Sequence, residues 1–303
     1  MRGDQMIKRY LDKYSTAVLL FPYITLFIIF IVIPVVAAVG LSFTYFNTIE
    51  WPKFIGLDNY INLFTKDEVF MQKVVPNTIV YSIFVGIGGY LLSFFLAWSL
   101  SQISKLPRTI LAIIIYSPSM TGGVLLTTVW SVIFNGDKSG YLNYILLKFN
   151  VIKEPVLWLQ SDKYLLVIMI IVTLWSSMGV GFLAILAGIL NINEELYEAA
   201  YIDGVKNRFQ EIIYVTIPSA KPQMLFGAVM ALVNTFQSSG IGVALSGANP
   251  TPNYAGQLIV THIEDYGFIR YEMGYAAAIS VVLLIIIRFS SVGAQKLFGN
   301  SDY

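Results

Sequence analysis

The sequence predicts an all-α integral membrane protein with six transmembrane helices, and two observations support this fold class. Hydrophobic residues make up 56% of the 303 residues and charged residues only 12%, whereas soluble proteins carry roughly 25% charged residues. The charges also leave long gaps, and a helix that crosses a bilayer needs about 20 largely apolar residues. Six stretches without Asp, Glu, Lys or Arg are Tyr14–Ile49, Val74–Ser104, Thr109–Gly136, Tyr164–Asn193, Pro222–Ile263 and Met273–Ile287.

The first span has the length of a membrane helix. Its apolar run from Val18 to Phe43 is far longer than the roughly 7–15 residues of a signal-peptide core, so we interpret it as a retained helix. We expect an N-terminal extension at 1–15, the first span at 16–44 and an external loop at 45–75. The five remaining spans follow at 76–292, and a tail at 293–303.

Basic residues flank the first span unevenly and thereby predict the orientation of the chain. Arg2, Lys8, Arg9 and Lys13 precede this span, whereas only Lys53 lies close behind it. Lys and Arg are enriched in the loops that stay in the cytoplasm. We therefore expect a multi-pass protein of the plasma membrane whose N- and C-termini are both cytoplasmic.

The longest internal loop, at about 191–221, has the pattern of helix rather than of a linker. Acidic and basic residues alternate there with apolar ones at steps of three and four, which is typical of an amphipathic helix. Asn193 followed by Glu194 and Glu195 resembles a helix start. We expect two short helices interrupted at Gly204, with an apolar side that needs the bundle or another protein as a partner.

This loop also carries a motif. The motif consists of Glu198-Ala199-Ala200, then Gly204, then Val215-Thr216-Ile217-Pro218. It resembles the EAA loop of ABC-importer permeases. It departs from the family pattern in having ten instead of nine residues after the glycine, and Val and Ile in place of Ile and Leu. The segment FIGLDNY, from Phe54 to Tyr60, is similar to one in the maltose-permease-like, binding-protein-dependent sugar transport family. The resemblance covers roughly Ile55 to Leu297.

The resemblance implies a permease core of five helices at 76–292, with the loop at 191–221 acting as a coupling helix on a cytoplasmic ATPase subunit. Glu198 would offer a charged contact, Gly204 a sharp turn, and Pro218 would mark the start of the next helix. The expected ATPase-coupling residues are Glu198, Ala199, Ala200, Asp203, Gly204 and Pro218. The alternative is that Ala199, Ala200 and Gly204 only pack a re-entrant loop.

The family also implies partners: a second homologous permease, two ATPase subunits and an extracellular solute-binding protein that delivers a sugar. No GxxxxGK[ST] phosphate loop is present in this chain, so we expect ATP and magnesium on the ATPase, no cofactor here and no enzyme activity. A net charge of +1 lacks the excess of basic residues that is typical of nucleic-acid-binding proteins.

Two rival functions remain open. A self-contained secondary transporter or channel for a neutral polar solute needs an ionisable group inside the spans or an inverted repeat, and an intramembrane enzyme needs a catalytic group there. The sequence shows neither. His262, the only histidine, is expected to be an ordinary loop or interface residue rather than a proton relay.

A substrate site at membrane depth has only hydroxyls, amides and aromatic faces to use, which suits a neutral sugar. By analogy with the maltose permease, Asn234 and Gln237 of the fifth span are the leading lining candidates. The full predicted lining is Asn234, Gln237, Ser238, Trp175 and Ser177. The alternative is hydrogen bonding between helices, which we favour for the fourth-span residues. An oligosaccharide is the favoured cargo, with a monosaccharide or a phosphorylated polyol as alternatives.

Overall fold

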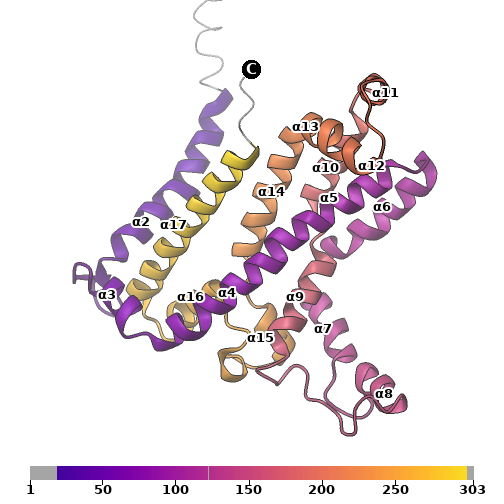
Figure 1. The fold of residues 1–303 in the computed structure, drawn as a ribbon. Helices are drawn as coiled ribbons and strands as arrows, with labels where there is room; N and C mark the ends of the chain where they lie inside the picture. Colours follow the sequence, from indigo (N-terminus) through magenta and orange to yellow (C-terminus); the bar gives the residue numbers. More distant parts are fainter. Residues whose placement is uncertain (1–18, 122, 299–303) are drawn as a thin grey trace, which may run out of the picture.

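The computed structural model describes residues 19–121 and 123–298, and these are mostly helical (Figure 1). Three continuous helices are long and apolar enough to cross a membrane, at Leu19–Leu41, Phe70–Ser101 and Met273–Lys296. The first contains η1 (Ile28–Val32) and α2 (Ile33–Leu41). The second contains η2 (Phe70–Val74), α4 (Val75–Tyr81), η3 (Ser82–Ile87) and α5 (Gly88–Ser101), and the third is α17 (Met273–Phe298).

Two further candidate spans are bent. Helices α6 (Lys105–Met120) and α7 (Gly123–Ile133) meet at 97°, and α9 (Leu165–Ser176) and α10 (Val180–Leu190) meet at 44°. The remaining candidate, α14 (Lys221–Phe236), has 16 residues, fewer than the roughly 20 that a straight span needs. The described residues therefore hold three to five spans by length and composition, and the count of six stays a prediction.

The shorter elements gather at the two ends of the bundle (Figure 1). Helices α11 (Glu194–Ile202), α12 (Arg208–Glu211) and α13 (Ile217–Ser219), with η4 (Ile212–Thr216) among them, lie at the end where the first helix begins and α17 finishes. The opposite end holds α3 (Asp58–Thr65), α8 (Tyr141–Lys148), α15 (Ile241–Ser246), η5 (Pro252–Tyr254), α16 (Ile259–Glu264) and η6 (Asp265–Ile269). The first described residues of the first helix, the described end of α17 and the loop at 191–221 therefore lie at the same end of the bundle.

The expected loop at 45–75 is largely ordered into secondary structure. Strand β1 (Thr44–Tyr45) pairs antiparallel with β2 (Lys53–Phe54), and the second span already begins at Phe70. The Asn59 amide donates hydrogen bonds of 2.9 Å to the carbonyl oxygens of Ser42 and Thr44. The FIGLDNY segment therefore ties the end of the first helix to α3.

A buried carboxylate holds the elements at this end together. Asp67 Oδ2 accepts hydrogen bonds from His262 Nε2 at 3.0 Å, Tyr275 at 2.9 Å and Tyr266 at 3.3 Å. Burial alone would raise the pKa of Asp67, but the bonds from His262, the Phe70 N–H and Tyr275, together with the charge of His262, lower it to about 2. Of the two alternatives expected for His262, a loop or an interface residue, the structure shows the second: His262 lies buried in α16, where it contacts Asp67 and Phe70.

Close packing joins α10 to α14. A Cβ atom on Gly181 would lie 3.3 Å from both the Cα and the carbonyl oxygen of Gly227. Small residues let membrane helices approach to backbone contact. Beside this contact, Phe182 and Ile185 of α10 pack in one buried cluster with Ala97 of α5.

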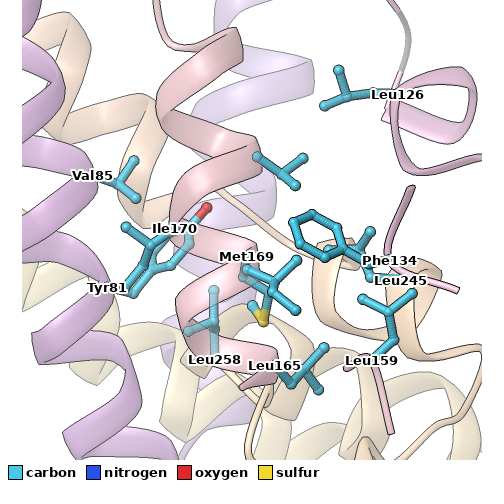
Figure 2. Close-up of a cluster of buried hydrophobic side chains, with 12 residues drawn as sticks. Tyr81, Val85, Leu126, Phe134, Leu159, Leu165, Met169, Ile170, Leu245 and Leu258 are labelled. Atoms are coloured by element: carbon cyan, nitrogen blue, oxygen red, sulfur yellow. The ribbon is translucent and has the colours of Figure 1, made fainter. Parts of the chain in front are cut away.

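A second buried cluster packs the second span against α9. Figure 2 shows Tyr81 and Val85 beside Met169, with Leu245 and Leu258 nearby. These side chains come from the second span, from α9 and from the segment after α14, so the cluster closes the bundle between the α10–α14 contact and the end that holds α15 and α16.

We predict that Gly181→Val lowers the free energy of unfolding by roughly 1–3 kcal/mol, because the new methyl groups meet the Gly227 backbone, which cannot yield locally. Gly40→Val is the matched control, since a Cβ at Gly40 meets nothing within 4 Å. Thermal unfolding in detergent measures the difference. Equal midpoints for the two variants would show that the α10–α14 contact is not tight.

Candidate functional site

A cavity of about 440 Å³ opens between the second span, the α9–α10 break and α14. It lies against the α10–α14 contact, because Gly181 and Gly227 are both part of its wall. Its volume falls within the roughly 300–1,000 Å³ of small-molecule sites. The polar side chains in the wall are Tyr90, Ser93, Tyr116, Ser119, Thr173, Ser176, Ser177, Asn234 and Thr235.

The cavity wall is polar without being charged. Among the described residues that form it, hydroxyl groups and the Asn234 amide alternate with glycine and apolar side chains, and none is Asp, Glu, Lys, Arg or His. Hydroxyls and amides can donate and accept hydrogen bonds, and tyrosine rings offer flat apolar faces. The site therefore suits an uncharged ligand that carries many hydroxyl groups.

The bend between α9 and α10 shapes this wall. Helix α9 ends at Ser176 and α10 begins at Val180, with Gly179 in a non-helical conformation between them. Ser176, Ser177 and Gly179 thereby become wall residues. Helix breaks at membrane depth are tolerated where they line a cavity.

Two of the five predicted lining residues face the cavity, Asn234 and Ser177. Gln237 caps the end of α14 and is exposed. Trp175 is half-exposed and packs edge-on against Trp130, with ring centroids 5.6 Å apart. Ser238 is also outside the wall.

The hydrogen bonds separate lining residues from residues that join helices. The Ser177 hydroxyl donates to the Leu174 carbonyl oxygen of its own helix at 2.8 Å. The Asn234 amide bonds to no other residue in the described part of the chain. Ser238, by contrast, lies 2.9 Å from the hydroxyl of Tyr81, which also donates to Thr173 at 2.9 Å. Ser238 therefore joins helices.

Sequence reasoning missed Tyr81. It is 1% exposed and its hydroxyl connects the second span, α9 and the end of α14. A tyrosine inside a charge-free span was the available signal, because a buried tyrosine hydroxyl needs a hydrogen-bond partner.

A second feature lies where α10 ends and α14 begins. We call residues 191–220 the coupling hairpin, comprising α11, α12, η4 and α13 with their connections. Helix α11 starts as expected, because Asn193 Oδ1 accepts a 3.2 Å bond from the Glu195 N–H. Gly204 has φ of 98°, a left-handed conformation that favours glycine.

The hairpin presents the motif to solvent. No residue of α11 is buried, and Glu198, Ala199, Asp203 and Gly204 are exposed, whereas Ala200 is half-buried. Pro218 does not open the next span as expected. It lies inside the helical run from α12 to α13, and α14 begins three residues later with Pro222 in its first turn.

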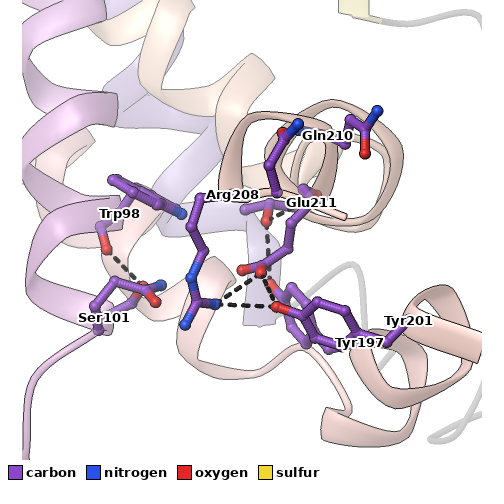
Figure 3. Close-up of polar contacts among 10 residues, drawn as sticks. Trp98, Ser101, Tyr197, Tyr201, Arg208, Gln210 and Glu211 are labelled. Carbon is purple, nitrogen blue, oxygen red and sulfur yellow. Dashed lines mark hydrogen bonds and ion pairs between the residues drawn. The ribbon is translucent and has the colours of Figure 1, made fainter. Parts of the chain in front are cut away.

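Glu211, which sequence reasoning did not single out, holds the hairpin together (Figure 3). Its carboxylate is 4% exposed. It accepts a 2.6 Å hydrogen bond from the Tyr201 hydroxyl and forms an ion pair with Arg208, whose Nη1 lies 2.7 Å away. The bond to Glu211 raises the pKa of Tyr201, because it stabilises the protonated hydroxyl that donates the bond. A glutamate within an amphipathic stretch gives no sequence signal that distinguishes it from an exposed one.

Comparison with known proteins decides the family. Residues 3–297 match the model of the binding-protein-dependent transport system inner membrane component family. The chain belongs to this family. The predicted resemblance to ABC-importer permeases is thereby confirmed, and membership identifies the protein as a transport component.

Relatives of this permease include the probable ABC transporter permease protein YesP of Bacillus subtilis, 32% identical over 100% of this chain and 94% of the relative. The arabinooligosaccharides transport system permease protein AraP of Bacillus subtilis is 28% identical over 92% of this chain and 87% of its own length. A chain from a bacterial ABC transporter involved in import of the acidic polysaccharide alginate superposes with a TM-score of 0.76 and 26% identity, covering 98% of this permease and 99% of that chain.

The permease contains no cysteine, so single cysteines can test whether the cavity is wet. We predict that Asn234→Cys reacts with a hydrophilic maleimide, because only a thiol in contact with water forms the reactive thiolate readily. Ala228→Cys, buried on the same helix but outside the cavity wall, is the control and should stay unlabelled. Labelling of both residues at similar rates would contradict a discrete cavity.

Proposed function

We propose that this chain is the transmembrane permease subunit of an ATP-binding-cassette importer that moves an oligosaccharide into the cytoplasm by alternating access. The observation that carries the proposal is the connection of two features. The uncharged, hydroxyl-lined cavity and the exposed coupling hairpin are built on the same two helices, α10 and α14. A displacement of the hairpin therefore displaces the cavity wall.

The cargo follows from the chemistry of the wall. Hydroxyl and amide groups can replace the hydration of an uncharged sugar, whereas a carboxylate or phosphate would lose its water without gaining a cation. The relative named for arabinooligosaccharides supports an oligosaccharide. By contrast, the polysaccharide named for the alginate importer is acidic. We therefore favour an uncharged oligosaccharide over a phosphorylated polyol.

The energy would come from partner subunits. Glu198, Ala199, Ala200, Asp203 and Gly204 form the exposed surface proposed to contact the ATPase, with Ile202 beside them at 87% exposure. Pro218, also exposed, lies in the run of helix that leads to α14. Two ATPase subunits would bind ATP and magnesium.

The complete importer would add a second homologous permease and an extracellular solute-binding protein. One solved relative of this fold is an alginate transporter in complex with a periplasmic protein. We place the N- and C-termini and the coupling hairpin on the cytoplasmic side of the plasma membrane. The binding protein would then deliver sugar to the end that holds α3, α8, α15 and α16.

We predict that Gly204→Val lowers ATP-dependent sugar uptake by membrane vesicles on the order of tenfold. A side chain at a left-handed φ costs roughly 1–2 kcal/mol, and this strain reorients α11. Glu198→Ala, which removes the charged contact, should also lower uptake, whereas Lys206→Ala at a neighbouring exposed position should not. Uptake that needs no ATP in the unaltered complex, or that follows an ion gradient, would contradict the proposal.

The charge of the cargo gives a separate prediction. An uncharged oligosaccharide should be imported, and a uronate oligosaccharide of equal length should not, even when each is supplied with a binding protein that captures it. Supplying both binding proteins removes their selectivity from the comparison. Import of the two sugars at equal rates would show that the cavity does not select against charge.

A further inference from the structure

Helix α11 stands partly free of the bundle. None of its residues is buried, and a cavity of about 440 Å³ separates it from the turn after α5 and the end of α10. Leu196 and Ile202 are 49% and 87% exposed, so apolar packing does not fix the angle of this helix. Its orientation must depend on a few specific contacts.

Two tyrosine hydroxyls supply those contacts. Tyr197 and Tyr201 are four residues apart on α11 and therefore lie on one face of it. The Tyr197 hydroxyl is 3.2 Å from Thr216 Oγ1, and the Tyr201 hydroxyl donates to Glu211 Oε2 at 2.6 Å. Figure 3 shows the Tyr201 hydroxyl and Arg208 directed toward Glu211.

Both anchor points are buried and bonded to neighbouring groups. Thr216 is 0% exposed and Glu211 is 3% exposed. A buried carboxylate needs compensating partners, and Arg208 Nη1 at 2.7 Å provides a charged one. Thr216 Oγ1 also donates to the Glu211 carbonyl oxygen at 3.4 Å. Glu211 and Thr216 belong to the helical run 208–219, which only the turn residue Ala220 separates from α14, the helix that carries Asn234 to the cavity.

We propose that Tyr197 and Tyr201 are positioning residues that clamp α11 to the helical run leading into α14. Force applied to α11 then moves α14 and the cavity wall instead of swinging α11 alone. This inference rests on the proposed function for its consequence in transport, whereas the clamp itself is a property of the isolated chain. The two parts can therefore be tested separately.

The clamp is tested first without transport. A spin label is placed at Glu198→Cys in the cysteine-free chain, and its mobility is compared between the parent and the double variant Tyr197→Phe/Tyr201→Phe. We expect a clear gain in mobility when both hydroxyls are removed. Tyr214→Phe is the control, since Tyr214 is 68% exposed and its hydroxyl bonds to no residue in the described ranges. Unchanged mobility in the double variant would overturn the clamp.

The transmission of force is tested in the assembled complex by counting sugar molecules imported per ATP hydrolysed. The double variant should keep its ATPase subunits on co-purification but import roughly tenfold less sugar per ATP, the effect expected when hydrogen bonds of this kind are lost. An unchanged ratio would overturn the inference. So would loss of the ATPase, because the tyrosines would then be docking contacts rather than positioning residues.

Variants of Glu211 provide a rescue. Glu211→Gln keeps an oxygen that accepts from Tyr201, so its ratio should stay within about threefold of the parent, whereas Glu211→Leu should behave as the double tyrosine variant. Equal ratios for the two Glu211 variants would contradict the role of the acceptor. If the parent complex itself imports no sugar with ATP while label mobility responds as expected, the clamp stands and the proposed function fails.

Discussion

The contact between Gly181 and Gly227 is the constraint on which the rest of the permease depends. Without side chains at this point, α10 and α14 approach to backbone distance, and in a membrane such packing replaces the hydrophobic effect as the force that holds helices together. The same two helices border the cavity and continue at one end into the coupling hairpin. A close-packed pair moves as one body, because packed interfaces resist continuous deformation. We therefore propose that the pair is the mechanical link between the hairpin and the cavity.

The two ends of this link differ in chemistry because they have different tasks. The cavity wall consists of hydroxyl groups and one amide, with no charged side chain among its described residues, so a sugar can enter without displacing an internal ion pair. The hairpin uses a buried carboxylate, Glu211, with a guanidinium and a tyrosine hydroxyl as partners. A neutral site binds reversibly, whereas a charge-assisted cluster keeps its geometry under load.

Much of the fold was readable from the sequence, for physical reasons. Charge-free stretches located the helices, since lipid excludes charge, and Asn193 and Gly204 marked the limits of α11 through capping and a left-handed turn. Features that depend on partners distant in the sequence were not readable. His262 meets Asp67 across 195 residues, and Tyr81 meets Ser238 across 157. The helix break after α9 was not predicted, because Ser177 and Gly179 lie within an apolar run that is compatible with a continuous helix. Gln237 was predicted to line the cavity but does not, because α14 ends before it.

The central claim is that the coupling hairpin and α14 move as one body. The most direct test is the distance between spin labels at Glu194→Cys, an exposed position of α11 outside the proposed ATPase contact, and Phe226→Cys on α14, measured in the assembled complex without nucleotide and with nucleotide trapped on the ATPase. We predict the same distance in both states, while the cavity changes the side of the membrane from which it is accessible. A distance that changes when nucleotide is trapped would show that α11 hinges on the bundle, and would contradict the account.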